Sequence, residues 1–468
     1  MRVCLIVEGA YPYVMGGVAS WIQNNIQHFS DVEFIVQTIV VDRQEKKKFA
    51  YQIPANVVEI REAYLQDEDY GKIKRKIRLT KKEKHALESL FWGDEVDWET
   101  LFEFFQKKKV SINALLSSEE FLEISRLYYE KHYPEEVFAD FLWTMRSMFL
   151  PLFSILNTQL PEADLYHVLS TGYAGILGSM AKFFYNKPLL LSEHGIYTRE
   201  REEEIIRAEW VKGIYKDLWI HVFQKYSTCC YKYADVVTAL FQNAANLQVE
   251  CGCAKDKITI IRNGIDILEY QNLPQKEDDD QFINIGAILR ITQIKDVKTL
   301  ISAFAAAKRM DQRLKLWIMG PDGEDREYVE ECKELVRLYK VEDIIFTGKI
   351  DVKDYIGKMD FLILTSISEG QPLVILEGFA AKKPFICTNV GNCAGMLYGE
   401  SDNLGKAGII VPVMGIEEIK DAMLYLASHE DIRKEMGEIG YQRVKNYYKV
   451  DDVYAQYKFL YDNLKEEE

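Results

Sequence analysis

Four charged side chains follow apolar runs in the C-terminal half of the sequence. Arg290 and Lys295 come after the run FINIGAI, and Glu369 and Glu377 lie in SISEGQPLVILEGFA. Because ligands bind beyond the carboxyl ends of parallel strands, these side chains are candidates for a binding site. Two cations on such a loop can neutralise a diphosphate, since arginine offers a planar fork of donors and lysine a point charge. Either cation alone would more simply be explained as an ordinary solvent-exposed surface residue.

Glu377 has an unusual setting for a carboxylate. Gly370 and Pro372 open a helix, and Glu377 falls about one turn inside it, between Leu376 and Gly378. A charge is costly to bury without partners, and sugar hydroxyls would supply hydrogen-bond donors. The alternative is a local partner, either a backbone group or a cation. The charged residues together predict a site for a ligand that carries a diphosphate and hydroxyl groups.

A second candidate is the glycine pair in VEGAYPYVMGGVASWI. Gly16 and Gly17 separate an apolar strand from a predicted helix. Glycine lets the backbone approach a ligand, and the free N–H groups at a helix start favour a phosphate. A tight turn explains the pair equally well. The stretch matches neither the dinucleotide fingerprint GxGxxG nor the Walker pattern ending in GK[ST], so it does not support an NAD or P-loop site.

The bulk properties exclude several classes of protein. A chain of 468 residues with 48% hydrophobic and 28% charged residues indicates two folded domains. Its net charge of −15 argues against a nucleic-acid binder. The eight cysteines have neither CxxC nor zinc-type spacing, which predicts no metal site and no disulfide framework. The apolar run before Glu8 is too short for a signal sequence or a membrane span, which predicts a cytoplasmic protein.

The first half of the chain alternates between strand-like and helix-like segments. This alternation is typical of βαβ units in a doubly wound sheet. The predicted strands are 3–7, 34–41, 165–169, 188–192 and 235–240. The segment of about 62–160 has helical periodicity and almost no strand signal, which predicts a helical insertion.

A domain boundary is predicted where YQNLPQKEDDDQ, residues 270–281, combines proline with a charge run. The expected domains are therefore 1–275 and 276–468, and the terminal helix is a candidate to cross back to the first domain. A second doubly wound sheet is predicted from strands at 282–288, 314–319, 344–347, 360–365, 385–388 and 408–411.

These features together resemble a known family. The pair Gly16-Gly17, the cations Arg290 and Lys295, and the Glu-x7-Glu spacing of EGQPLVILE are similar to the retaining GT-B glycosyltransferases of family 4. That family has two Rossmann-like domains that face each other across a nucleotide-sugar cleft. The stretches EGAYPYVMGGVASWI, LSEHGIYTRERE, RNGID and SEGQPLVILEG, and the helical insertion, are similar to the cytosolic glycosyltransferases of bacterial Pel exopolysaccharide biosynthesis.

The resemblance implies a role for each residue of the C-terminal half. Glu377 would bind the ribose hydroxyls of the nucleotide, and Glu369 would lie beside the donor sugar near its 3-hydroxyl. Arg290 and Lys295 would hold the diphosphate and stabilise the negative charge that develops as the anomeric C–O bond breaks. The other implied substrate-binding positions of this motif are Gly370, Gln371, Pro372 and Leu373.

The resemblance also assigns residues elsewhere. His194 in LSEHGIY would lie near the donor sugar and the reacting centre, and Arg199, with its neighbours Tyr197 and Arg201, would shape the acceptor side. Asn263 in RNGID would lie at the cleft edge with a mainly structural role. Gly320 would let the chain pass near the nucleotide, together with Gly323, and Ile350, together with Lys349, would meet the base through backbone groups.

The expected activity is transfer of a hexose or N-acetylhexosamine from a UDP-sugar to a growing exopolysaccharide, with retention and without a metal or cofactor. No nucleophilic carboxylate is evident in the first domain, which favours a same-face displacement over a covalent intermediate. The expected partners are the nucleotide sugar, a polysaccharide acceptor and a membrane-bound polysaccharide synthesis complex that would recruit the protein to the inner face of the membrane through the insertion. The alternatives are a UDP-sugar 2-epimerase of the same architecture and a non-catalytic nucleotide-binding scaffold.

Overall fold

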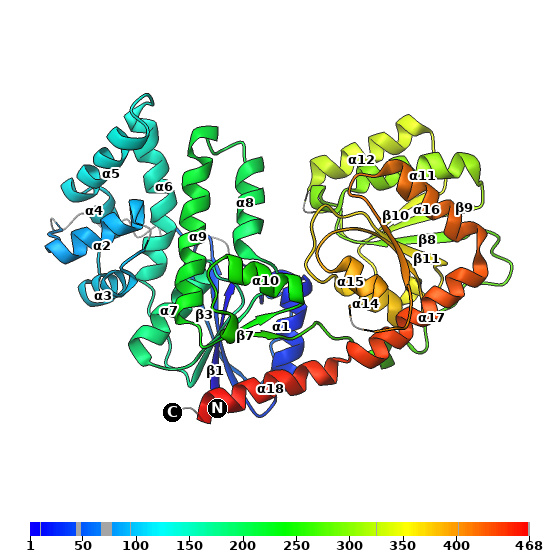
Figure 1. Cartoon of the computed structure of the whole chain (residues 1–468), viewed down its shortest axis with the longest axis horizontal. Coiled ribbons are helices and arrows are strands. Elements are labelled where there is room, and N and C mark those ends of the chain that lie inside the picture. Colours follow the sequence, from blue (N-terminus) through cyan, green and yellow to red (C-terminus); the bar gives the residue numbers. More distant parts are fainter. Residues whose placement is uncertain are drawn as a thin grey trace. The chain divides into compact units, whose positions relative to one another are not determined.

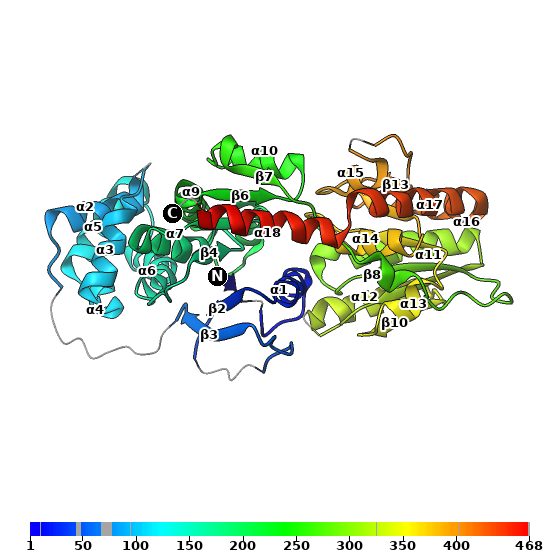
Figure 2. The same ribbon diagram turned by 90° about the horizontal axis from the view of Figure 1, so that it is seen from below.

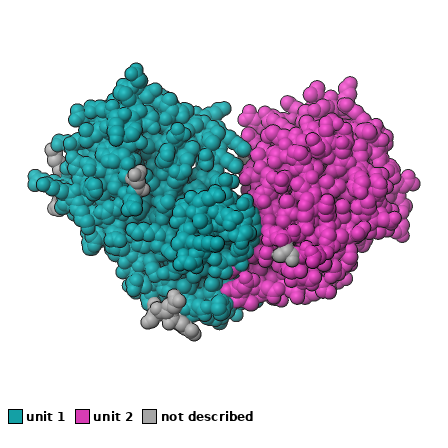
Figure 3. All heavy atoms as spheres, in the orientation of Figure 1, with its two compact units in different colours: residues 1–260, 457–468 teal, residues 261–456 magenta. Residues whose placement is uncertain are grey.

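The structure is a computed structural model that describes residues 1–9, 11–43, 48–66, 77–93, 95–323, 325–400 and 402–466. The chain divides into two compact units, coloured teal and magenta in Figure 3. Unit 1 is Met1–Ile260 with Tyr457–Glu468, and unit 2 is Ile261–Gln456. Unit 2 therefore begins before the predicted linker at 270–281, because Ile265 forms a β-bridge with Lys449 and the segment packs with the rest of that unit.

Unit 1 is built on a parallel sheet with the order β3-β2-β1-β4-β5-β6-β7. Its strands are β1 (Arg2–Glu8), β2 (Glu33–Val40), β3 (Val57–Tyr64), β4 (Leu165–Val168), β5 (Leu189–Ser192), β6 (Val236–Ala239) and β7 (Ile258–Ile260). The prediction of a doubly wound sheet is confirmed. The strand order reverses between β1 and β4, so the loops after these two strands flank the switch point of unit 1.

The predicted helical insertion corresponds to a group of helices between β3 and β4. They are α2 (Lys81–Trp92), α3 (Trp98–Lys108), α4 (Ile112–Leu116), α5 (Glu119–His132) and α6 (Phe138–Leu156). Local capping fixes where they start: Thr80 and Glu83 form a capping box on α2, and Asp97 and Ser118 cap α3 and α5. Figures 1 and 2 both show α2–α5 grouped together, with α6 joining them to α7 (Tyr173–Tyr185).

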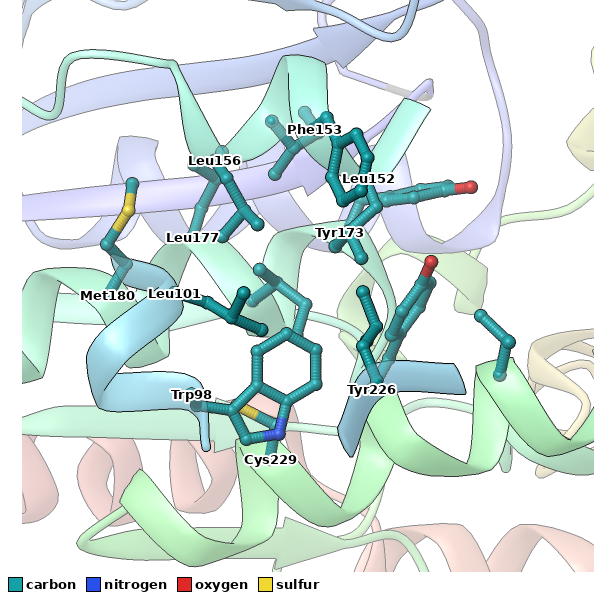
Figure 4. Packing of buried hydrophobic residues seen from close by; sticks show 14 of the residues in the cluster. Trp98, Leu101, Leu152, Phe153, Leu156, Tyr173, Leu177, Met180, Tyr226 and Cys229 are labelled. Carbon is teal, nitrogen blue, oxygen red and sulfur yellow. The ribbon is translucent and has the colours of Figure 1, made fainter. Parts of the chain in front are cut away.

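One large apolar core joins the insertion to the sheet. Figure 4 shows Trp98 and Leu101 of α3 packed with Leu152 of α6 and Leu177 of α7. Cys229 of α9 (Lys216–Tyr233) belongs to the same core. The insertion is therefore part of the fold of unit 1. The remaining helices of this unit are α1 (Gly17–His28), α8 (Tyr197–Arg207), α10 (Gln242–Glu250) and the end of α18 (Val450–Glu466).

Unit 2 contains a second parallel sheet with the order β10-β9-β8-β11-β12-β13. Its strands are β8 (Ile283–Ile288), β9 (Leu314–Met319), β10 (Ile344–Gly348), β11 (Phe361–Leu364), β12 (Phe385–Thr388) and β13 (Gly408–Val411). All of them were predicted. The order reverses between β8 and β11, so the loops after these two strands flank the switch point of unit 2, where ligands bind in such sheets.

The helices of unit 2 cover both faces of its sheet. One apolar cluster contains residues of α11 (Val297–Met310), α12 (Arg326–Tyr339) and α16 (Ile416–Ser428), and another contains residues of α14 (Leu373–Ala380), α15 (Cys393–Tyr398) and α17 (Glu430–Tyr447). The short helix α13 (Lys353–Ile356) follows β10. Across the residues described in both units, no helix combines the length and the apolar character needed to cross a membrane.

Candidate active site

The switch point of unit 2 holds a direct ion pair. The ammonium Nζ of Lys295, after β8, lies 2.5 Å from Oε1 of Glu369, after β11. Both side chains are largely buried, with 18% and 11% of their surface exposed. The Ser366 hydroxyl donates to the same carboxylate oxygen at 2.6 Å. The structure thus brings together two residues that the family resemblance assigned to different parts of a ligand.

Two hydrogen bonds to backbone carbonyls hold these two loops together. The Thr365 hydroxyl donates to the Lys295 carbonyl at 3.1 Å, and the Ile367 N–H donates to the Ile294 carbonyl at 2.8 Å. Behind Glu369, Gly391 has φ +50, and a Cβ there would lie 2.2 Å from the Glu369 carbonyl oxygen. The backbone of the Glu369 loop therefore packs tightly against Gly391, where a residue with a Cβ would not fit.

Glu377 lies in α14 as a half-buried carboxylate without a hydrogen-bond donor among the residues that the structure describes. Burial raises its pKa, and the charge of Lys353 opposes this only in part. Lys353 itself is paired with Glu269, with 2.5 Å between Nζ and Oε2. The local partner that the sequence left open is not found in the described part of unit 2, and the carboxylate is available to a ligand.

The residues between the two glutamates are mostly structural. Pro372 occupies the N-cap position of α14 without a capping hydrogen bond, and Leu373 is the first residue of the helix. Gln371 is buried, and its Oε1 accepts from the Asn263 N–H at 2.6 Å, while Asn263 Nδ2 donates to the Gln371 carbonyl at 3.1 Å. These bonds join the RNGID turn to the loop of Gly370. They support the expectation of a mainly structural role for Asn263.

The other predicted positions of unit 2 lie at neighbouring strand ends. Arg290 is exposed on the loop after β8. Gly320, at the end of β9, has φ +150, and a Cβ there would lie 1.9 Å from the Leu289 carbonyl oxygen, so glycine is required for the loop of Arg290 to pass. Ile350 follows β10 and packs against the core of α14, two strands from β8.

The glycine pair of unit 1 begins helix α1. Gly16 has an extended backbone, with φ 178, and a Cβ there would meet no atom of the described residues within 4 Å. The turn therefore does not require glycine at this position. Helix α1 starts at Gly17 with no side-chain cap and no acidic residue in its first turn, which leaves its N–H groups available to an anion.

His194 follows β5 and is held against an aromatic ring. Its imidazole contacts Trp21 edge-on, with ring centroids 4.7 Å apart, and its Nε2 is buried without a partner among the described residues. Burial lowers its pKa to about 4, so the ring is neutral at pH 7. A neutral ring with an unused nitrogen can make one further hydrogen bond to a ligand.

A second histidine, not predicted from the sequence, also contacts Trp21 edge-on. The Nδ1 of His167, on β4, lies 2.9 Å from the Tyr461 hydroxyl oxygen, and its Nε2 lies 2.8 Å from the Ser192 hydroxyl oxygen. Burial lowers its pKa to about 3. Both of its nitrogens have protein partners, so His167 is a structural residue beside His194.

Two carboxylates at strand ends were also missed. Glu193 is buried and accepts from the Tyr231 hydroxyl at 2.7 Å, from Gln248 Nε2 at 3.1 Å and from the Tyr197 N–H at 3.1 Å. Burial raises its pKa to about 7. These bonds fix the start of α8 and hence the loop that carries His194. The acid just before the histidine in LSEHGIY is the signal that could have revealed it.

Glu8 ends β1, next to the switch point of unit 1. Its Oε1 accepts from the Ser170 hydroxyl at 2.7 Å and from the Ala174 N–H at 2.8 Å, and burial raises its pKa. Arg201 lies close enough to oppose that rise. Arg199, by contrast, is exposed on α8. The Glu8 carboxylate thus joins the end of β1 to the loop after β4 and to the start of α7, which gives it a structural role.

Comparison with known proteins fits this arrangement. Residues 1–256 match the family model described as "Domain of unknown function (DUF3492)", and residues 280–429 match the one described as "Glycosyl transferases group 1". The chain is 27% identical over 285 residues to an uncharacterized glycosyltransferase of Methanocaldococcus jannaschii, which covers 61% of this chain and 71% of the relative. It is 26% identical over 242 residues to N-acetyl-alpha-D-glucosaminyl L-malate synthase of Bacillus anthracis. That alignment covers 49% of this chain and 59% of the relative.

A solved structure has the same fold along the whole chain. Anabaena HepE, determined in complex with UDP, aligns with a TM-score of 0.64 at 13% identity over 99% of this chain and 100% of that one.

The two doubly wound units, with their charged switch point, define a glycosyltransferase with the GT-B fold and a C-terminal unit of the group 1 type. The chain belongs to the family described as "Domain of unknown function (DUF3492)", whose model covers more than half of it.

Proposed function

We propose that the protein is a retaining glycosyltransferase of family 4 that transfers a hexose or N-acetylhexosamine from a UDP-sugar to a growing exopolysaccharide, as the Pel glycosyltransferases do. The observation that carries the proposal is the carboxylate of Glu377, which lacks a donor among the described residues, in the same unit as the Lys295–Glu369 pair. Ribose hydroxyls are the donors that Glu377 lacks. The UDP named in the Anabaena HepE complex supports uracil as the base.

The cations supply the chemistry of the proposed reaction. Breaking the anomeric C–O bond moves negative charge onto the diphosphate, and fixed positive side chains stabilise that charge more in the transition state than in the ground state. Arg290 and Lys295 have this role in the proposal. Because they provide the positive charge, the mechanism uses neither a metal ion nor another cofactor.

The ion pair also suggests how donor binding is coupled to sugar recognition. Glu369 neutralises Lys295 in the arrangement described here. A diphosphate would give Lys295 a second acceptor, and Glu369 would then be able to accept from the 3-hydroxyl of the donor sugar. Neutral His194 would offer one hydrogen bond to the sugar or the acceptor, and the loop of Gly16 and Gly17 would admit the diphosphate.

The experiment that tests the proposed activity uses the full chain and a set of UDP-sugars. Isothermal titration identifies the nucleotide and donor that bind, and incubation with and without oligosaccharide acceptors identifies the reaction. Transfer that keeps the anomeric configuration supports the proposal. Formation of a new sugar nucleotide without an acceptor would instead indicate a 2-epimerase, and binding without turnover a scaffold.

The exported product of such a reaction implies a partner at the membrane. We place the protein in the cytoplasm, recruited by a membrane-bound synthesis complex that contacts the insertion. In support, the start of α6 presents apolar surface: Trp143 is 65% exposed and Val137, its N-cap, is 61% exposed. Replacing both by serine should release the protein from membranes that contain its partners. Unchanged membrane association would contradict this part of the proposal.

A further inference from the structure

Unit 1 contains a pocket that is separate from the strand-end residues described above. It has a volume of about 610 Å³ and lies between strands β2 and β3 and helices α4 and α6. This volume is within the range of small-molecule sites. Its lining is mostly polar or charged and includes Gln37, Arg61, Ser111, Asn113, Ser154 and Asn157. We call it the Gln37 pocket.

Gln37 is an amide at a position where packing alone would favour an apolar residue. It lies on β2 between Ile35 and Ile39, which point to the same face of the sheet and belong to the core that α6 covers. The side chain is 1% exposed, and neither its Nε2 nor its Oε1 has a partner among the described residues. Burying an amide without partners destabilises a fold, so such a group requires an explanation.

Two neighbouring side chains of the pocket, Asn157 and Arg61, also have polar atoms that can hydrogen-bond to a ligand. Asn157 donates from Nδ2 to the Val110 carbonyl at 2.7 Å, which fixes its amide, and its Oδ1 is buried without a partner in the described part of the chain. Arg61 pairs with Gln37 across β2 and β3, so both side chains lie on the same face of the sheet. Its Nε donates to Glu59 at 2.7 Å, and its terminal NH₂ groups have no acceptor among the described residues.

The mixture of donors and acceptors indicates the class of ligand. A phosphate or another simple anion accepts only, and it would leave the oxygens of Gln37 and Asn157 unused. A sugar hydroxyl both donates and accepts, so a polyhydroxylated ligand can satisfy the amides and the arginine together. We propose that the Gln37 pocket binds an oligosaccharide, namely sugar residues of the acceptor that do not react. The identity of the ligand as acceptor rests on the proposed glycosyltransferase function.

The proposal is tested by binding measurements on the full chain with Gln37→Leu. Hexasaccharides of glucose, galactose, N-acetylglucosamine and N-acetylgalactosamine are the probes, and saturation-transfer NMR with titration gives their affinities. The matched control is Thr38→Val. Thr38 is the next residue of β2, it points to the opposite face, and its Oγ1 is likewise buried without a partner among the described residues. Arg61→Gln is a second variant, at a more exposed position.

We expect at least one hexasaccharide to bind and Gln37→Leu to weaken it about tenfold or more, which corresponds to the loss of more than one hydrogen bond. Arg61→Gln should weaken the same probe, and Thr38→Val should not. If no probe binds, or if Gln37→Leu binds as the wild type does, the pocket holds only water and the proposal is wrong. UDP titration of the same variants separates the two proposals, because UDP binding should stay unchanged even if the pocket proposal fails.

Discussion

Lys295 and Glu369 form a largely buried ion pair at the switch point of unit 2, with 2.5 Å between Nζ and Oε1. Lys295 lies on the loop after β8 and Glu369 on the loop after β11, and each side chain neutralises the charge of the other. A diphosphate that binds here must share Lys295 with Glu369, so occupancy by the donor changes the partners of both residues. The carboxylate and the ammonium are therefore best tested together, by comparing nucleotide affinity with turnover.

Glu369→Gln should separate these two properties. The amide keeps the shape of the side chain but no longer neutralises Lys295, so UDP affinity should stay equal or rise. Turnover should fall about 100-fold or more, because an interaction with the reacting sugar is lost. The control is Glu400→Gln, which removes the carboxylate partner of Arg262 elsewhere in unit 2. Equal losses of turnover in the two variants would contradict the role given to Glu369.

Glu377→Gln should stabilise the fold and weaken nucleotide binding. The folded pKa of Glu377 is raised by burial, so the folded chain holds its proton to higher pH than the unfolded chain. The free energy of unfolding therefore falls as the pH rises from 4.5, the ordinary pKa of a glutamate, toward the raised pKa of Glu377 in the folded chain. Above that raised pKa the full loss of stability has been reached.

The variant should accordingly melt higher than the wild type at pH 7.5, and the gap should close as the pH approaches 4. UDP affinity should fall about tenfold or more, since a hydrogen bond to a charged group is lost. Thermal melts at several pH values and UDP titration check both effects. A lower melting temperature at pH 7.5 with unchanged UDP affinity would show that Glu377 has a protein partner.

Unit 1 should lose stability as the pH falls from about 6.5 to 4. Burial lowers the pKa of His194 to about 4 and that of His167 to about 3, whereas both have an ordinary value of 6.5. In this window the unfolded chain binds protons that the folded chain does not, so acid favours unfolding. His194→Gln removes one of these groups and should make the fall less steep. Identical pH dependence of the melting temperature in both proteins would contradict the burial of a neutral His194.

Gly16→Val should fold normally and react poorly. The backbone at Gly16 is extended and no described residue comes close to a Cβ there, so the side chain costs little in the folded state. If the donor approaches this backbone, the added methyl groups should lower kcat/KM about tenfold or more. Gly213→Val is the control, because Gly213 is equally open but lies before α9. A matching loss of activity in the control, or none in Gly16→Val, would remove Gly16 from the site.

Most of the fold could be predicted because buried parallel strands leave a simple pattern. Each strand of unit 2 is a short apolar run, and so are β1, β2, β4, β5 and β6. Strand β3 was missed because it lies at the sheet edge, where Glu59 and Arg61 interrupt the apolar pattern. Strand β7, at the other edge, has 3 residues and gives almost no signal.

The sequence predicted which residues of the candidate site follow the ends of strands, but not how their side chains interact. The sequence placed Lys295 and Glu369 after two strands that turn out to be neighbours, but it could not show that the side chains bond to each other. Glu193 and Gln37 were missed because their importance lies in what surrounds them. The Glu193 carboxylate accepts several hydrogen bonds, whereas the Gln37 amide has no hydrogen-bond partner in the described chain. Only the packing of the folded chain reveals this difference. An amide inside the apolar strand EFIVQTIV was the available signal for Gln37.

The most direct test of the central claim is a crystal structure of the protein with UDP. We predict the diphosphate within hydrogen-bond distance of Lys295 and Arg290, and the ribose hydroxyls donating to Glu377 at the switch point of unit 2. UDP bound away from these three residues, with Glu377 still lacking a partner, would contradict the proposed site.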